Sequence, residues 1–234
     1  MTLKYALKRS LPVMAGYIVL GIGFGILLEA KGYGVGWALL MSTLIYAGSM
    51  QYVAIDLITG GASLIQTALM TLMVNARHLF YGISMIDKYK GTGVRKPYLI
   101  FSLTDETYSL VCDGIVPEGV NEKQYYFLLS LFNQSYWILG SVIGSLIGNF
   151  ISFNTAGIDF SMTALFVVVF VDQWRNSKDH MSAITGVISS LICLLIFGPD
   201  KFILPSMLVI IILLTSLRKV LTPSELVTGG SEHE

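Results

Sequence analysis

Five long stretches of this chain contain no charged residue, and they restrict its fold more than any other feature. The stretches without Asp, Glu, Lys or Arg are residues 10–28, 32–55, 57–76, 124–158 and 181–199. A helix rises about 1.5 Å per residue, so about 20 residues match the roughly 30 Å hydrocarbon core of a bilayer. Charged residues make up 13% of the chain, against about 25% in a soluble domain. The sequence therefore predicts an all-α, polytopic transmembrane helix bundle.

The apolar pattern predicts about seven to eight segments, some of them broken or re-entrant. The segments are 10–28, 35–57, 61–86, 97–113, 124–151, 158–173, 181–198 and 202–217. The fourth and sixth are short for a full crossing. We expect one transmembrane domain over residues 1–220, followed by a polar, flexible tail at 221–234.

The distribution of Lys and Arg tests this count. Positive charges cluster at residues 4–9, 88–96, 175–178 and 218–219. If all four clusters are cytoplasmic, an even number of crossings separates each pair. Three apolar segments lie between the first two clusters and three between the second and third, so one in each set should fail to cross. The alternative is that residues 88–96 face outward. Re-entrant segments are tolerated only where protein or a cavity covers them.

Small residues indicate where helices break. The candidates are GIGFGIL at 21–27, YAGSMQY at 46–52 and GIDFSMTALF at 157–166, where small residues let the backbone leave regular helix. GIGFG and GIDFS share a weak G-I-x-F pattern, which suggests an internal inverted repeat of the kind that transporters use.

Arg77 and His78 are the most unusual residues, because they follow 20 uncharged residues directly. Asn75, His78 and Tyr81 share one helix face. Arg77 either extends to the lipid headgroups or pairs inside the membrane. LTDE at 103–106 supplies acids, and neighbouring acids on a helix point in different directions. One of them can therefore face Arg77 while the other faces a cavity. For Asp56, Glu106 and Asp159, an interfacial or helix-capping position is the alternative explanation.

Four stretches in order resemble the AzlC/YgaZ family: YAGSMQY (46–52), NARHLFYG (75–82), LTDETYSL (103–110) and GIDFSMTALF (157–166). LPVMAGYIVLGIGFG (11–25) is similar to the opening helix of that family. The resemblance spans roughly residues 10–217. Met50, Tyr52 and Ala76 depart from the commoner family residues and put only the pocket size in doubt. The resemblance implies the large subunit of a branched-chain amino-acid exporter in the bacterial inner membrane, acting with a small hydrophobic AzlD/YgaH-type subunit.

The residue chemistry fits a zwitterionic substrate. A carboxylate favours a cation or a helix N-terminus, and an aliphatic side chain favours an apolar pocket. We predict as substrate-binding residues Ser49, Gln51, Asn75, Arg77 and Asp105. We predict as proton-coupling or ion-pair residues Arg77, His78, Asp105 and Glu106. His78 either titrates during transport or only hydrogen-bonds a neighbouring helix.

The remaining expectations concern rival functions and partners. We expect no enzyme: the Gly-x-Ser at 82–84 lacks a histidine on another apolar helix. No phosphate-binding P-loop pattern occurs, and the zero net charge suggests no nucleic-acid partner. No cofactor or metal is expected. The N-terminus is predicted to be cytoplasmic. The alternative function is a passive channel, or a permease subunit of a larger complex without its own coupling.

Overall fold

The computed structural model describes residues 1–112, 116–150, 180–198 and 202–221, with scattered positions between 160 and 175. Within these ranges the chain forms helices and turns and no β-strand, which confirms the all-α prediction there. The chain divides into two compact units, Met1–Leu165 and Phe166–Glu234. The prediction of one domain over residues 1–220 with a tail at 221–234 stays a prediction.

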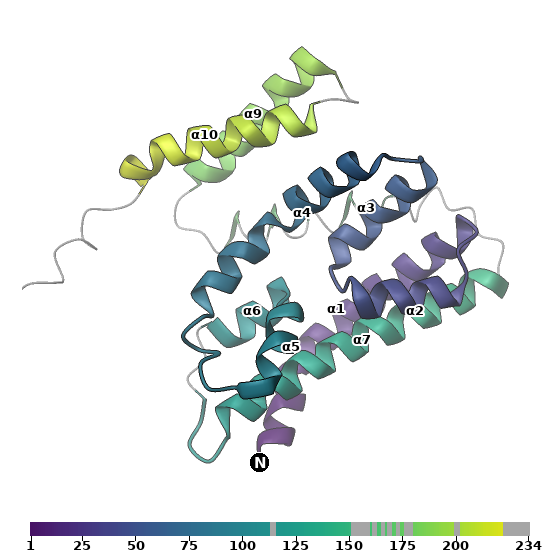
Figure 1. The fold of residues 1–234 in the computed structure, drawn as a ribbon, viewed down its shortest axis with the longest axis vertical. Coiled ribbons are helices and arrows are strands. Elements are labelled where there is room, and N and C mark those ends of the chain that lie inside the picture. Colours follow the sequence, from purple (N-terminus) through teal and green to yellow (C-terminus); the bar gives the residue numbers. More distant parts are fainter. Residues whose placement is uncertain are drawn as a thin grey trace, which may run out of the picture. The chain divides into compact units, whose positions relative to one another are not determined.

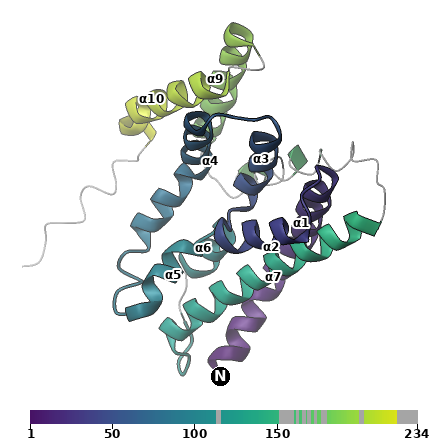
Figure 2. The ribbon, with the colours of Figure 1, turned by 45° about the vertical axis from the view of Figure 1, so that its right-hand side comes forward.

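Two long helices, α1 (Thr2–Ala30) and α7 (Glu122–Phe150), form the centre of the first unit. They run parallel, because the backbone N–H of Asn121 donates to Thr2 Oγ1 at one end and Ser145 Oγ donates to Glu29 Oε2 at the other. Figures 1 and 2 show them side by side. By length and hydropathy, these two of the described helices are suited to cross a bilayer.

The second apolar segment forms a hairpin of two short helices, α2 (Val35–Leu44) and α3 (Gly48–Thr59). Gln51 Nε2 donates to Ser42 Oγ at 3.2 Å across the hairpin. The turn at 45–47 contains Tyr46 at φ 43°, a left-handed conformation that side chains rarely adopt. The hairpin begins at the end of the unit where α1 stops, extends into the unit, and turns back so that α3 ends on the same side. The predicted break at 46–52 is therefore confirmed.

The next helix, α4 (Leu64–Ser84), runs back toward the end of the unit that holds the N-terminus. Ser63 caps it by accepting a hydrogen bond from the Gln66 backbone at 3.2 Å. Its 21 residues span about 31 Å, enough to cross a bilayer. Because Asn75, Arg77 and His78 fall within it, α4 is less apolar than α1.

A second hairpin enters from the opposite end. After the short 3-10 helix η1 (Gly93–Arg95) come α5 (Lys96–Phe101) and α6 (Asp105–Cys112). Lys88 Nζ donates to the Val111 carbonyl at 2.7 Å, which holds the end of α6 near the loop that follows α4. The turn at 102–104 lies deep in the unit, where the Thr104 hydroxyl meets Tyr17 of α1 at 2.7 Å.

The first unit therefore repeats one topology in inverted orientation. Residues 2–59 form a long helix and a hairpin, and residues 64–112 form the same elements running the other way. The prediction of a break at 21–27 is wrong, because α1 is continuous there. Gly21 and Gly25 serve instead for close contact with α7. The break proposed at 157–166, and with it the predicted G-I-x-F repeat, lies largely outside the described residues.

The hairpins also bear on the number of crossings between the positive clusters at residues 4–9 and 88–96. Residues from the N-terminus and from the loop after α4 share one buried cluster with the start of α7, including Ala6, Met85, Tyr89, Leu99 and Tyr125. The first two positive clusters therefore lie at one end of the unit. In the chain between these two clusters, only α1 and α4 pass from one end of the unit to the other, because α2 and α3 fold back. This arrangement agrees with the interpretation that both clusters face the cytoplasm.

This arrangement predicts which residues are accessible from the same side of the membrane. Lys4→Cys and Lys90→Cys are expected to react with a membrane-impermeant maleimide from the same side, and Lys31→Cys from the opposite side. Intact and inverted membrane vesicles give the measurement. Labelling of Lys4→Cys and Lys90→Cys from opposite sides would contradict the re-entrant hairpin.

The second unit is described by two packed helices, α9 (Met181–Phe197) and α10 (Ile203–Leu221). They agree with the seventh and eighth apolar segments. An apolar pocket of about 350 Å³ lies between them, lined by Ile184, Cys193, Val209 and Leu213 among others. The sixth segment and Asp159 lie largely outside the described residues.

Candidate functional site

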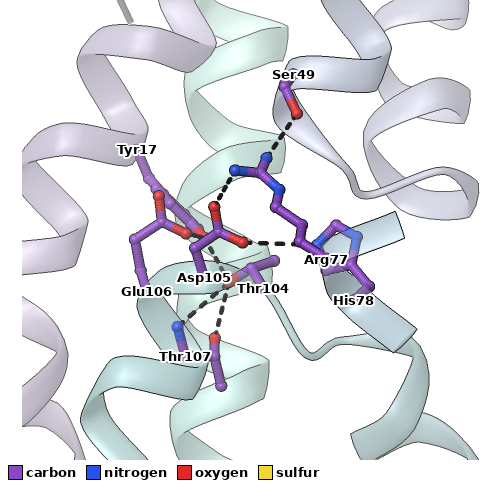
Figure 3. A network of polar contacts seen from close by, with 8 residues as sticks. All are labelled: Tyr17, Ser49, Arg77, His78, Thr104, Asp105, Glu106 and Thr107. Carbon is purple, nitrogen blue, oxygen red and sulfur yellow. Dashed lines mark hydrogen bonds and ion pairs between the residues drawn. The ribbon is translucent and has the colours of Figure 1, made fainter. Parts of the chain in front are cut away.

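The Arg77 side chain joins the two hairpins at the centre of the first unit (Figure 3). Its Nη1 lies 2.5 Å from Asp105 Oδ2, and its Nη2 donates to Ser49 Oγ at 2.8 Å. The side chains of Arg77 and Asp105 are 30% and 27% exposed. One cation on α4 thus binds the first turn of α3 and the first turn of α6. This places three predicted residues together, and it pairs Arg77 with Asp105 rather than Glu106.

The two hairpin turns place helix N-termini at this centre. The α3 helix begins at Gly48 after Ala47 in extended conformation. The α6 helix begins at Asp105, where Thr104 Oγ1 accepts a hydrogen bond from the Thr107 backbone at 3.3 Å. Helix N-termini carry partial positive charge, which the acids of α6 complement. The first turn of α3 contains no acidic residue, so no carboxylate of its own offsets its partial positive charge.

Glu106 points away from Arg77. Its Oε2 accepts a hydrogen bond from the Tyr17 hydroxyl of α1 at 2.6 Å. The Tyr17 hydroxyl also lies 2.7 Å from Thr104 Oγ1, and Thr104 in turn contacts the Thr107 hydroxyl. Asn133 of α7 donates to that Thr107 hydroxyl at 3.0 Å. The two neighbouring acids therefore belong to different networks.

A small pocket adjoins the centre between the two hairpin turns. Its volume is about 190 Å³, well above the about 10–15 Å³ that one water needs by the same measure. Its lining residues are Ile45, Tyr46, Ala47, Asn75, His78, Ile100, Phe101 and Leu103. Asn75 Oδ1 is buried there without a hydrogen-bond partner. His78 Nε2 lies 3.8 Å from Asp105 Oδ1, too far for a hydrogen bond.

Gln51 lies elsewhere. It is fully buried, donates to Ser42, and accepts a hydrogen bond from Trp137 Nε1 at 2.8 Å. Both ends of its amide are therefore occupied: the nitrogen joins the two helices of the first hairpin, and the oxygen joins the hairpin to α7. Among the described residues, no group of three or more His, Cys, Asp or Glu side chains is arranged to hold a metal ion.

Comparison with known proteins identifies the family. A family model described as AzlC protein matches residues 12–151, which include both hairpins and Arg77. This chain belongs to the AzlC family. The branched-chain amino acid transport protein AzlC of Bacillus subtilis is 45% identical over 222 residues, covering 95% of this chain and 87% of that protein.

More distant AzlC relatives extend the comparison. An uncharacterized membrane protein of Helicobacter pylori is 42% identical, with 93% of this chain and 96% of that protein covered. The inner membrane protein YgaZ of Escherichia coli is 25% identical, with 73% of each chain covered. No solved structure matches this chain.

Sequence reasoning missed several members of the site in this AzlC-family protein. Tyr17, Thr104, Thr107 and Asn133 form the network around Glu106. Asn133 gave a usable signal, because a buried amide inside the uncharged stretch 124–158 needs a hydrogen-bond partner. Tyr17 gave none, since an isolated tyrosine is common in apolar helices.

Proposed function

We propose that this chain is a secondary transporter that exports branched-chain, and other apolar, amino acids across the bacterial inner membrane. The observation that carries the proposal is the position of Arg77, held between the turns of two hairpins that enter the unit from opposite ends. Transporters built from inverted repeats bind their substrates where such discontinuous helices meet. The name of the Bacillus subtilis relative supports the substrate class.

The centre offers a partner for each part of an amino acid. The substrate carboxylate binds Arg77 and the N-terminus of α3, replacing Asp105. The freed Asp105 carboxylate and the unpartnered Asn75 Oδ1 then receive the ammonium group. The aliphatic side chain enters the pocket between Ile45 and Phe101. Ser49 remains within reach of the guanidinium throughout.

The hairpins suggest how access alternates. The hairpin of α2 and α3 closes one end of the centre, and the hairpin of α5 and α6 closes the other. Arg77 binds both through Ser49 and Asp105. A substrate that takes the place of Asp105 on Arg77 releases the second hairpin only. The site then opens toward the end with the N-terminus, which we place in the cytoplasm.

Three finer features complete the proposal. Transport is coupled to protons through the central cluster, to which α4 and α6 contribute the imidazole of His78 and the carboxyl groups of Asp105 and Glu106. A small hydrophobic AzlD/YgaH-type subunit acts with this chain, as the family resemblance implies. Residues 1–220 act as one transport domain.

Labelled leucine tests the proposed function. Proteoliposomes loaded with unlabelled leucine, with and without the small subunit, are expected to take up labelled leucine by saturable counterflow. Only a carrier that reorients with bound substrate gives counterflow. Uptake that rises linearly with concentration would favour the passive channel, and no uptake with either composition would contradict the proposal.

The pocket predicts a specificity residue. Phe101→Leu widens the pocket and is expected to weaken competition by leucine about tenfold, since one methylene in a shaped pocket is worth about 1–3 kcal/mol. Competition by larger apolar amino acids should weaken less. Leu79→Ala is the matched control, because Leu79 is exposed on α4 and does not line the pocket. An unchanged order of competitors in Phe101→Leu would exclude this pocket as the side-chain site.

A further inference from the structure

The charges at the centre do not balance. Arg77 and Asp105 compensate each other at 2.5 Å. Glu106 makes no ion pair within the described part of the chain. With a neutral His78, the cluster therefore has one excess negative charge. A zwitterionic substrate has zero net charge and leaves this excess in place. Because an uncompensated charge inside a membrane costs several kcal/mol, one further positive charge is needed with or without substrate.

The surroundings of Glu106 favour a proton over a cation. Titratable side chains interact with it from α1, the first hairpin turn, α4 and α6: Tyr17, Tyr46, His78, Tyr81 and the preceding residue Asp105. No permanent cation is among these side chains, and the guanidinium of Arg77 is already bound to Asp105 and Ser49. The nearest contribution from α7 is the neutral amide of Asn133, which reaches the same network through Thr107.

Hydrogen bonding at Glu106 is compatible with a neutral acid. Tyr17 donates to Oε2, which is the carbonyl oxygen if the proton sits on Oε1. His78 is less suited to this role. Its Nε2 makes no hydrogen bond to Asp105, and a proton there would add a second cation beside Arg77 in the sequence.

We propose that Glu106 carries the coupling proton, held as the neutral acid in the substrate-free centre, with Tyr17 as its positioning hydrogen-bond donor. The proposal rests on the proposed transport function. The acid releases one proton to water on one side of the membrane and the carboxylate takes up one proton from the other side. No bond other than the O–H bond is broken or formed, and no electrons are exchanged.

Infrared spectroscopy tests the proton site without transport. In purified protein in lipid nanodiscs at neutral pH, the wild type is expected to show the carbonyl stretch of a protonated carboxylic acid. Glu106→Gln should remove that band and Asp105→Asn should retain it. Tyr17→Phe should shift its frequency, because the carbonyl loses its hydrogen bond. A wild type without the band, or a Glu106→Gln variant that keeps it, would overturn the proposal.

Transport measurements separate coupling from substrate binding. In Glu106→Gln, leucine movement driven by a pH gradient is expected to fall to the leak of empty liposomes, a larger factor than the fall in counterflow at equal pH. In His78→Gln the two rates should change by the same factor, and Asp87→Asn in the exposed loop should change neither. Glu106→Asp, which keeps a carboxyl group, should restore part of the gradient-driven rate.

The outcomes distinguish the two proposals. Gradient-driven movement in Glu106→Gln at the wild-type rate would overturn the role of Glu106, as would its selective loss in His78→Gln. Absence of counterflow in the wild type would instead contradict the proposed function, and the infrared band would still decide whether Glu106 holds a proton.

Discussion

Replacing Arg77 with leucine is expected to abolish leucine counterflow and to destabilise the protein. The substitution removes the cation that binds Asp105 at 2.5 Å and Ser49 at 2.8 Å. Asp105 then remains as an uncompensated charge, and breaking a buried ion pair in this way costs about 3–5 kcal/mol. The partial exposure of both side chains places the expected loss near the lower value. Counterflow and thermal unfolding in detergent measure the two effects.

A double variant with two neutral side chains separates the structural role of Arg77 from its role in binding. The double variant Arg77→Gln/Asp105→Asn contains no uncompensated charge, so it should recover most of the lost stability. It should still fail in counterflow, because no cation remains for the substrate carboxylate. Lys90→Leu is the control: Lys90 pairs with Asp87 on the surface, where such pairs contribute about 0–1 kcal/mol. Counterflow at the wild-type rate in the double variant would show that Arg77 only stabilises the fold.

The sequence predicted the contents of the site better than its geometry. It indicated that Arg77 needs an acid from LTDE, but it left Asp105 and Glu106 open. The choice depends on where α6 begins, because consecutive helical residues point about 100° apart. Thr104 followed by two acids is a helix-start signal, yet inside an apolar segment it was interpreted only as an interruption. The sequence therefore indicated that the fourth apolar segment is short for a full crossing, but it did not place the turn at 102–104.

Gln51 shows a second limit. A buried polar side chain must find partners, but the sequence does not say whether those are a substrate or other side chains. Here the partners are Ser42 in the same hairpin and Trp137 in α7, 86 residues away. Asn75 fitted the same prediction, and its oxygen is left without a partner beside the pocket. Only the packed structure distinguishes the two amides.

Glycine was ambiguous for a related reason. Gly21 and Gly25 in GIGFG suit either a break in a helix or the close approach of two helices. The sequence favoured a break, because it did not show which helix lies opposite. The structure places α7 there, with its own glycines at 140, 144 and 148. The α1 and α7 backbones therefore meet closely along one seam, and this seam carries the second large prediction.

Gly25→Ala is expected to prevent the packing of α1 on α7. A Cβ at this position would lie 2.1 Å from the Ser141 carbonyl oxygen, which belongs to the backbone and does not rotate away. The helices must separate, so the cost should exceed the about 1–3 kcal/mol typical of overpacking. Gly144→Ala approaches the Ile22 carbonyl oxygen equally closely and should act in the same way. Unfolding temperature and the amount of protein in the membrane fraction measure the effect.

Gly16→Ala in the same helix is the matched control. Beyond the neighbouring backbone of α1 itself, nothing lies within 4 Å of a Cβ there, and alanine favours helix over glycine by about 1 kcal/mol, so the stability of this variant should be equal or higher. Equal stability of Gly25→Ala and Gly16→Ala would contradict the close seam. The seam also bears on function, because α1 carries Tyr17 and α7 carries Asn133, which meet the Glu106 network from two sides. A variant that survives separation of α1 and α7 should therefore lose proton coupling before it loses the Arg77 pair, which neither helix contacts through a hydrogen bond or ion pair in the described structure.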